Sequence, residues 1–206
     1  MMRKDKKKHG ENKIILFALG IIFLIWGIIA IANSLMTEPA QILWFCYLGL
    51  VLIGIGIFMG NGGLIGSQIA ILGIPLIFWD IDFIYRAVSG LSLLGITDYF
   101  LVNRPILSQL ISAQHLFTLP LALYALYLVK VKKTDFWKIS IAEVIALFFA
   151  SYLFSKPESN INCVFRSCVN VDIGLPYKIE WFLVFFVLII VSNFILSKMK
   201  FLFKKK

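Results

Sequence analysis

One histidine lies deep within an apolar stretch of the chain, and its type and position suggest chemistry more directly than any other residue. His115 stands nine residues into the apolar run 106–129, at a depth of about 14 Å if the run is helical. An imidazole exchanges a proton near neutral pH, so His115 could act as a general base, a proton relay or a binding group. The structural alternative is a hydrogen bond from His115 to a carbonyl of a neighbouring helix.

Two aspartates close the preceding apolar run, and they are the acidic candidates to act with the histidine. Asp82 is followed four residues later by Arg86, a spacing that predicts an intrahelical ion pair. Asp80 has no charged residue at the same spacing, so we expect it to find a partner across the bundle, take up a proton or face water. An Asp80–His115 pair would fix the imidazole tautomer and raise its basicity, which suits base or relay chemistry.

Bends in the two apolar runs that carry these residues predict a cavity between them. Gly73-Ile74-Pro75 marks a bend in the run that ends with the aspartates, and Pro120 follows His115 closely enough to kink its helix. Bent helices with polar residues on adjacent spans often line a cavity. We therefore expect an outward-facing polar pocket. Its predicted binding residues are Asp80, Asp82, Gln114 and His115, and its candidate catalytic residues are His115 and Asp80.

The loop between the last two apolar runs carries two of the three cysteines. Cys163 and Cys168 are five residues apart and can close a small disulfide ring on the oxidising side of a membrane. A nucleophilic Cys163 served by His115 is the alternative. A zinc site would need further nitrogen or sulfur ligands, and the second histidine, His9, falls on the other side, so we predict neither metal nor cofactor.

Other polar residues inside the apolar runs have structural explanations. We expect Glu143 to extend toward Lys138 or water, and Gln68 and Gln109 to form hydrogen bonds between helices. The spacing of Gly62 and Gly66 predicts a close approach of two helices.

The composition places the chain in a membrane. Of its residues 60% are hydrophobic and 15% are charged, and the mean hydropathy is +0.90. A soluble domain has about half apolar and about a quarter charged residues. The net charge of +9 lies in short blocks between apolar runs and not along a surface interleaved with aromatic residues, so we expect no nucleic-acid partner.

Six apolar runs approach the length of about 20 residues that a helix needs to cross a bilayer. They predict an all-α, six-helix transmembrane bundle spanning residues 14–198, because the backbone within lipid must satisfy its own hydrogen bonds. The runs are Ile14–Asn33, Ile42–Gly60, Leu64–Tyr85, Ile106–Val129, Ile139–Phe154 and Ile179–Lys198.

The basic residues predict the orientation of the bundle. Fifteen of the twenty Lys and Arg residues lie in the segments that are cytoplasmic if the N-terminus is inside. We therefore expect a multi-pass protein of the cell membrane, N-in and C-in, with cytoplasmic basic segments at 1–13 and 199–206. The first run, followed by Ala30-Ile31-Ala32, also resembles a cleavable signal peptide, but its length and Trp26 favour a retained helix.

Several short stretches resemble a known group of proteins. Over most of its length the chain is similar to small multi-pass membrane proteins of prokaryotes, and of archaea in particular, that have no assigned activity. The stretches are Gly95-Ile96-Thr97-Asp98-Tyr99-Phe100, Gln114-His115-Leu116-Phe117 and Asn160-Ile161-Asn162-Cys163-Val164.

A looser resemblance is to the six-helix androgen-induced membrane hydrolases, which pair a threonine nucleophile with an intramembrane histidine. That resemblance implies a base role for His115. It supplies no nucleophile, because Thr37 lies between the first two runs and not within them.

Three functions follow as hypotheses. The first is a membrane protein with an outward-facing pocket, anchored by Asp80 and His115, that binds a small or lipidic ligand. The second is a membrane-embedded lipid hydrolase or transferase with His115 as base, which needs a nucleophile or a bound water beside the imidazole. The third is a structural or assembly component in which the polar residues serve packing alone. In each case membrane lipid is a partner.

Overall fold

The computed structural model describes residues 2–100, 105–169 and 173–203, and of residues 2–9 the backbone alone. The described chain is helical, with 78% of it in helices and no strand. The elements are α1 (Met2–Thr37), η1 (Pro39–Leu43), α2 (Phe45–Phe58), α3 (Gly62–Ser89), η2 (Asp98–Phe100), α4 (Ile106–Ser112), α5 (His115–Val129), α6 (Trp137–Phe154), η3 (Ile161–Cys163), α7 (Tyr177–Lys198) and η4 (Lys200–Leu202).

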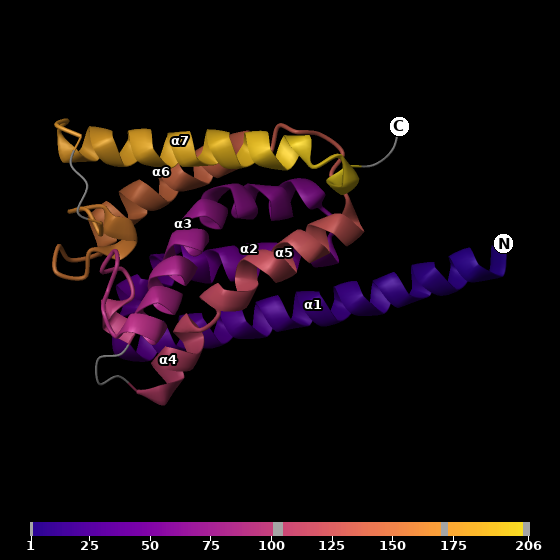
Figure 1. Cartoon of the computed structure of the whole chain (residues 1–206), viewed down its shortest axis with the longest axis horizontal. Helices are drawn as coiled ribbons and strands as arrows, with labels where there is room; N and C mark the ends of the chain where they lie inside the picture. Colours follow the sequence, from indigo (N-terminus) through magenta and orange to yellow (C-terminus); the bar gives the residue numbers. More distant parts are fainter. Residues whose placement is uncertain (1, 101–104, 170–172, 204–206) are drawn as a thin grey trace.

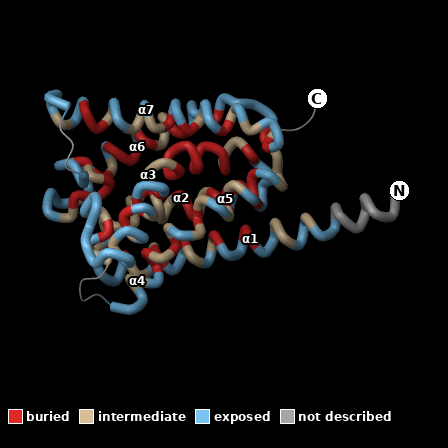
Figure 2. The backbone as a smooth tube through the Cα atoms, viewed as in Figure 1, coloured by how far each residue is buried: buried red, intermediate tan, exposed pale blue. Residues whose placement is uncertain are grey.

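Helix α3 is the centre of the bundle. It contacts α2, α5, α6 and α7, while α1 runs along α2 and extends past the other helices (Figure 1). Buried residues follow α3 and the sides of its neighbours that face it (Figure 2). Both chain termini lie at one end, here called the terminal end. The loops after α3 and after α6 lie at the opposite end, here called the loop end (Figure 1).

The outer faces of the helices are apolar. Ile77 on α3, Phe149 on α6 and Ile190 on α7 are each about half exposed, at 46%, 52% and 58%. A water-soluble monomer rarely exposes so much contiguous apolar surface, and hydrocarbon is the solvent that suits it. This is the architecture of a helical membrane protein.

Five of the predicted spans correspond to helices long and apolar enough to cross a membrane. These are Gly10–Thr37, Gly62–Ser89, Ile106–Val129, Trp137–Phe154 and Tyr177–Lys198. The remaining predicted span corresponds to α2, an apolar helix of 14 residues that is shorter than the others because η1 occupies the start of the predicted run.

The two prolines behind the expected bends both lie inside helices, Pro75 in α3 and Pro120 in α5. The helical run around His115 is interrupted before the histidine instead, since α4 ends at Ser112 and α5 begins at His115. The bends at the prolines stay predictions. Helix α3 begins where the Asn61 side chain accepts hydrogen bonds from two backbone N–H groups, and it ends at Gly90, whose φ of +74° suits glycine.

The terminal end of the bundle is closed by docking of the C-terminal turn η4. The Val131 N–H donates to the Leu202 carbonyl at 2.8 Å, and both side chains are buried. The Lys130 ammonium also donates to the carbonyl of Phe201. Residues 200–202 are therefore part of the folded bundle and not a free tail.

Glycine allows α3 to approach this closure. A Cβ added to Gly62 would lie 2.4 Å from the Lys130 carbonyl oxygen, so no larger residue fits without a backbone shift. Four residues further on, a Cβ on Gly66 would lie 3.3 Å from the Phe136 ring. A close approach is present at this glycine pair, but its partners Lys130 and Phe136 flank α5 and α6, whereas the prediction was contact with the side of a second helix.

We predict that Gly62→Ala destabilises the protein, by about 1–3 kcal/mol, because the obstructing atoms belong to the backbone. Gly73→Ala on the same helix is the matched control, since its Cβ would meet only side-chain atoms at ordinary distances of 3.6 and 3.7 Å. The midpoint of thermal unfolding in detergent measures both effects. An equal response of the two variants would contradict the close contact at Gly62.

Candidate ligand pocket

A pocket of about 680 Å³ lies at the loop end, between η1, α2, α3, the start of α5 and the two loops. Its apolar side, here called the deep wall, consists of the buried Ile71, Leu72 and Leu76 and the half-buried Phe185. Its rim is polar, with Glu38 and Gln41 from η1 and its cap, and Glu158, Ser159 and Arg166 from the loop after α6. Aromatic residues, namely Trp44, Tyr47, Trp79 and Tyr99, line the space as well.

His115 lines this pocket, and its binding or catalytic role stays a prediction. Its Nδ1 lies 2.6 Å from the Ser112 carbonyl oxygen. A carbonyl oxygen can only accept, so Nδ1 carries the proton and Nε2 keeps its lone pair. The contact to a carbonyl is the structural role proposed from the sequence, with the acceptor on the preceding helical turn instead of a neighbouring helix.

Trp79 holds the histidine ring in place. The two rings are stacked with their centroids 4.6 Å apart, and the Trp79 Nε1–H donates to the Tyr99 hydroxyl at 3.0 Å. The Phe83 ring is stacked on Trp79 as well, with the ring centroids 5.1 Å apart. The imidazole is thus held by its own backbone turn and by an indole.

Asp80 does not occupy the place that the sequence suggested. The pocket is lined by Trp79 and not by its neighbour Asp80, and no Asp80–His115 hydrogen bond is present among the described residues. The Asp80 Oδ1 is buried and has no hydrogen-bond partner within the described part of the chain. A ligand-binding role for Asp80 stays a prediction.

Asp82 organises the loop after α3. One carboxylate oxygen accepts from the N–H groups of Leu93 and Leu94 at 2.9 and 2.6 Å, and the other accepts from the N–H and hydroxyl of Thr97 at 2.8 and 2.6 Å. The predicted pair with Arg86 is wrong, because Arg86 forms its ion pair with Asp98 of the same loop. Five donors, the Ser92 hydroxyl at 3.4 Å included, satisfy the buried carboxylate better than one cation on the helix surface would.

Gln114 lies next to His115 but turns into the helical bundle. It is fully buried, and the Thr118 hydroxyl oxygen lies 2.7 Å from its backbone carbonyl oxygen and 2.6 Å from its side-chain oxygen, which share the one hydroxyl hydrogen. The Gln114 Nε2 has no partner among the described residues, and the residue does not line the pocket.

Asn162 connects the pocket rim to three helices. It was not among the site residues predicted from the sequence. Its amide accepts from the Phe45 N–H at 3.0 Å and donates to the Leu43 carbonyl at 2.7 Å and the Ser151 hydroxyl at 3.0 Å. Its own carbonyl accepts from the Trp181 Nε1–H at 2.9 Å. The loop after α6 is thereby attached to η1 and α2, to α6 and to α7.

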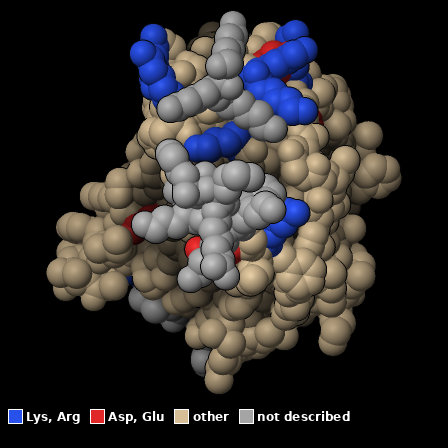
Figure 3. Space-filling view, turned by 90° about the vertical axis from the view of Figure 1, so that its right-hand side faces the viewer, with Lys and Arg blue, Asp and Glu red and all other residues tan. Residues whose placement is uncertain are grey.

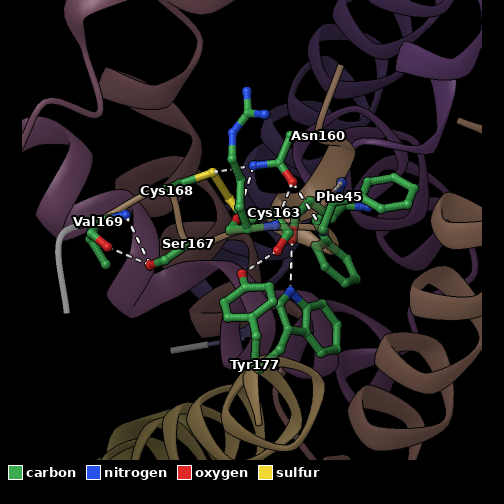
Figure 4. Close-up of a disulfide and its surroundings, with 11 residues drawn as sticks. Phe45, Asn160, Cys163, Ser167, Cys168, Val169 and Tyr177 are labelled. Atoms are coloured by element: carbon green, nitrogen blue, oxygen red, sulfur yellow. Dashed lines mark hydrogen bonds between the residues drawn. A yellow bond between two sulfur atoms is a disulfide. The ribbon is translucent and has the colours of Figure 1, made fainter. Parts of the chain in front are cut away.

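The predicted disulfide between Cys163 and Cys168 is present, and it is part of the same loop (Figure 4). The Asn160 amide oxygen accepts from the N–H groups of Phe165 and Arg166, and its Nδ2 donates to the Arg166 carbonyl, so this side chain fills the small ring. The Tyr177 hydroxyl donates to the Cys163 carbonyl at the start of α7. The repeated asparagine was the sequence signal, since asparagine tolerates the positive φ of 44° and 53° found at these two positions.

A side-chain nucleophile in contact with His115 is not found among the described residues. No hydroxyl or thiol among the described residues is hydrogen-bonded to His115, and Cys163 is held in the disulfide. The described residues also contain no group of three or more His, Cys, Asp or Glu side chains that could hold a metal ion.

Comparisons with known proteins identify no relative of this chain. No family model, curated protein or solved structure matches the chain. The two resemblances noted in the sequence stay predictions, and the interpretation of the pocket depends on its own geometry.

We predict that Asn162→Gly lowers the free energy of unfolding by about 2–5 kcal/mol, because it strands two backbone groups at the start of α2 and the Ser151 hydroxyl. Glycine keeps the positive φ, so the variant isolates the lost hydrogen bonds. Asn162→Ala should lose still more, since alanine adds backbone strain. Thermal unfolding midpoints compare the variants, and a wild-type midpoint for Asn162→Gly would show that the amide holds nothing together.

Proposed function

We propose that this protein is a multi-pass membrane protein whose loop-end pocket binds a small amphiphilic molecule without transforming it. The observation that carries the proposal is the polarity of the pocket. Its deep wall is made of Ile71, Leu72, Leu76 and Phe185, whereas charged and polar side chains line its rim. An amphiphile matches both ends at once, with an apolar chain inside and a polar head at the rim.

The size of the cavity supports this class of ligand. Pockets for small molecules and cofactors span roughly 300–1,000 Å³, and the value of about 680 Å³ falls in the middle of that range. A single apolar chain with a compact head fits such a space, whereas a bulky soluble molecule would leave the apolar wall exposed to water.

The polar side chains of the pocket determine which chemical groups are favoured on the head of the ligand. With Nδ1 committed to Ser112, the His115 Nε2 is an acceptor, so it favours a ligand hydroxyl or ammonium. Trp44, Tyr47 and Tyr99 line the pocket with aromatic rings, which attract a cationic group. A head with a hydrogen-bond donor or a positive charge therefore satisfies the pocket better than a plain carboxylate does.

The same proposal places the protein in the cell membrane, with six spans and with both termini in the cytoplasm. Both termini lie at one end of the bundle (Figure 1), and Lys and Arg side chains are visible on that end (Figure 3). An excess of basic residues marks cytoplasmic segments. The pocket would then open on the outer side, where an oxidising environment suits the Cys163–Cys168 disulfide.

A labelling experiment tests this orientation. In a Cys46→Ser background, we predict that Leu91→Cys in intact cells reacts with a membrane-impermeant maleimide, because Leu91 is 65% exposed at the loop end. Thr134→Cys, at the terminal end, should react only after the membrane is opened. The reverse pattern would place the pocket on the cytoplasmic side.

We predict that wild-type protein purified in mild detergent retains an amphiphile, and that Leu76→Trp loses at least about nine-tenths of it because the indole fills the apolar wall. Ile77→Trp is the matched control, since Ile77 is the next residue on α3 and faces outward. Native mass spectrometry measures the bound mass.

Added probes define the head group in the same experiment. We expect lysophosphatidylcholine and a long-chain alcohol to raise the thermal unfolding midpoint of the wild type more than they raise that of Leu76→Trp. Absence of any retained mass, together with no response to either probe, would contradict the proposed function.

A further inference from the structure

A second polar site lies in the contact between α3 and α6, one helical turn along α3 from the pocket-lining residues Ile71 and Leu72. Gln68 and Glu143 are each six residues from the terminal-end start of their helices, which places both about 9 Å into the bundle. Gln68 is fully buried, and its Nε2–H donates to the Glu143 Oε2 at 2.6 Å. This contact corrects the expectation that Glu143 extends toward Lys138, whose ammonium lies over the Trp137 ring instead.

The orientation of the Gln68 amide follows from its other neighbour. The Ser67 hydroxyl donates to the Leu64 carbonyl at 2.7 Å, so its oxygen is free only to accept. The Gln68 atom that lies 3.3 Å from this oxygen must therefore be the amide nitrogen. Both hydrogens of Nε2 are then used, one toward Ser67 and one toward Glu143.

Two oxygen atoms are left over in this contact. The Gln68 Oε1 and the Glu143 Oε1 are both buried, and neither has a hydrogen-bond partner within the described chain. Both are acceptors if Glu143 is ionised, so they cannot satisfy each other. A buried acceptor without a hydrogen-bond partner destabilises the fold by about 1–3 kcal/mol, and a buried charge without a partner destabilises it more.

Among the described residues no cation forms an ion pair with Glu143. The one ion pair among the described residues joins Arg86 to Asp98 at the loop end. Lys198, at the terminal end of α7, lies over the Phe194 ring at 4.9 Å. The other titratable or charged residues on α6 and on the elements packed against it lie toward the loop end, and they are Glu38, Asp80, Asp82, Tyr85, Arg86, Tyr152, Tyr177, Lys178 and Glu180.

We propose that Glu143 binds a proton and forms a two-bond acid–amide pair with Gln68. The proton comes from water and occupies the Glu143 Oε1, which then donates to the Gln68 Oε1, while the Gln68 Nε2–H continues to donate to the Glu143 Oε2. One proton thus satisfies both stranded atoms and removes the uncompensated charge.

A metal ion fits these atoms less well than a proton does. Hard cations require six or more oxygen ligands, whereas the Gln68–Glu143 pair offers only two free oxygens. The site is therefore a proton-binding site, and in the proposed orientation it lies in the cytoplasmic half of the membrane. Loss of the proton leaves a charge between α3 and α6 and weakens their contact.

Infrared spectroscopy tests the bound proton directly. The difference spectrum of wild type minus Glu143→Gln at neutral pH should contain the C=O stretching band of a protonated carboxyl group. Glu11→Gln is the matched control, because Glu11 is exposed and should contribute only an ionised carboxylate. A difference spectrum that contains only carboxylate bands from Glu143 would overturn the proposal.

Thermal unfolding gives an independent result. The Glu143→Gln variant mimics the protonated acid, since its amide can donate to the Gln68 Oε1, so it should match the wild type at mildly acidic pH. As the pH is raised, the wild-type midpoint should fall while that of Glu143→Gln stays level. A Glu143→Gln midpoint as low as that of Glu143→Leu at every pH, or stabilisation of the wild type by added sodium ions, would also contradict a proton site.

Discussion

The amide of Asn162 is the contact on which the loop end of the bundle depends. The first N–H groups of a helix have no partner within it, and near a membrane few alternatives exist. The Asn162 side chain supplies the acceptor for Phe45 at the start of α2 and the donor for the carbonyl of Leu43. The same residue receives the Trp181 indole, so one asparagine joins η1, α2 and α7 and sets the rim of the pocket.

Asp82 repeats this principle on the other side of the pocket. Its carboxylate accepts hydrogen bonds from N–H groups of the loop after α3. The loop conformation that results places the Tyr99 hydroxyl where it accepts from Trp79, the residue stacked on His115. In both cases a buried polar side chain replaces the missing backbone partners of an irregular segment. The polar residues are few because lipid penalises them, and Asp82, Asn160 and Asn162 are among those that stabilise the loops and helix ends beside the cavity.

The sequence predicted the helices well because their positions follow from hydropathy, and it predicted the Cys163–Cys168 bridge because a short spacing limits the partners. It also identified His115 as a pocket residue. The roles of Asp82, Gln114 and Glu143 could not be predicted in this way. Their partners are backbone groups of a folded loop, the helix's own next turn, and an amide 75 residues away, none of which has a signature in local spacing. Asn162 was missed because its importance depends on a conformation that only the folded loop defines.

A density map of the protein in lipid nanodiscs tests the central claim most directly. The account predicts an elongated non-protein density that runs from Leu72 and Phe185 toward the rim at Arg166, with Asn162 bonded to the start of α2. A loop after α6 that is detached from α2, or a collapsed cavity filled by its own side chains, would contradict it. The polar residues at the loop end would then serve packing alone.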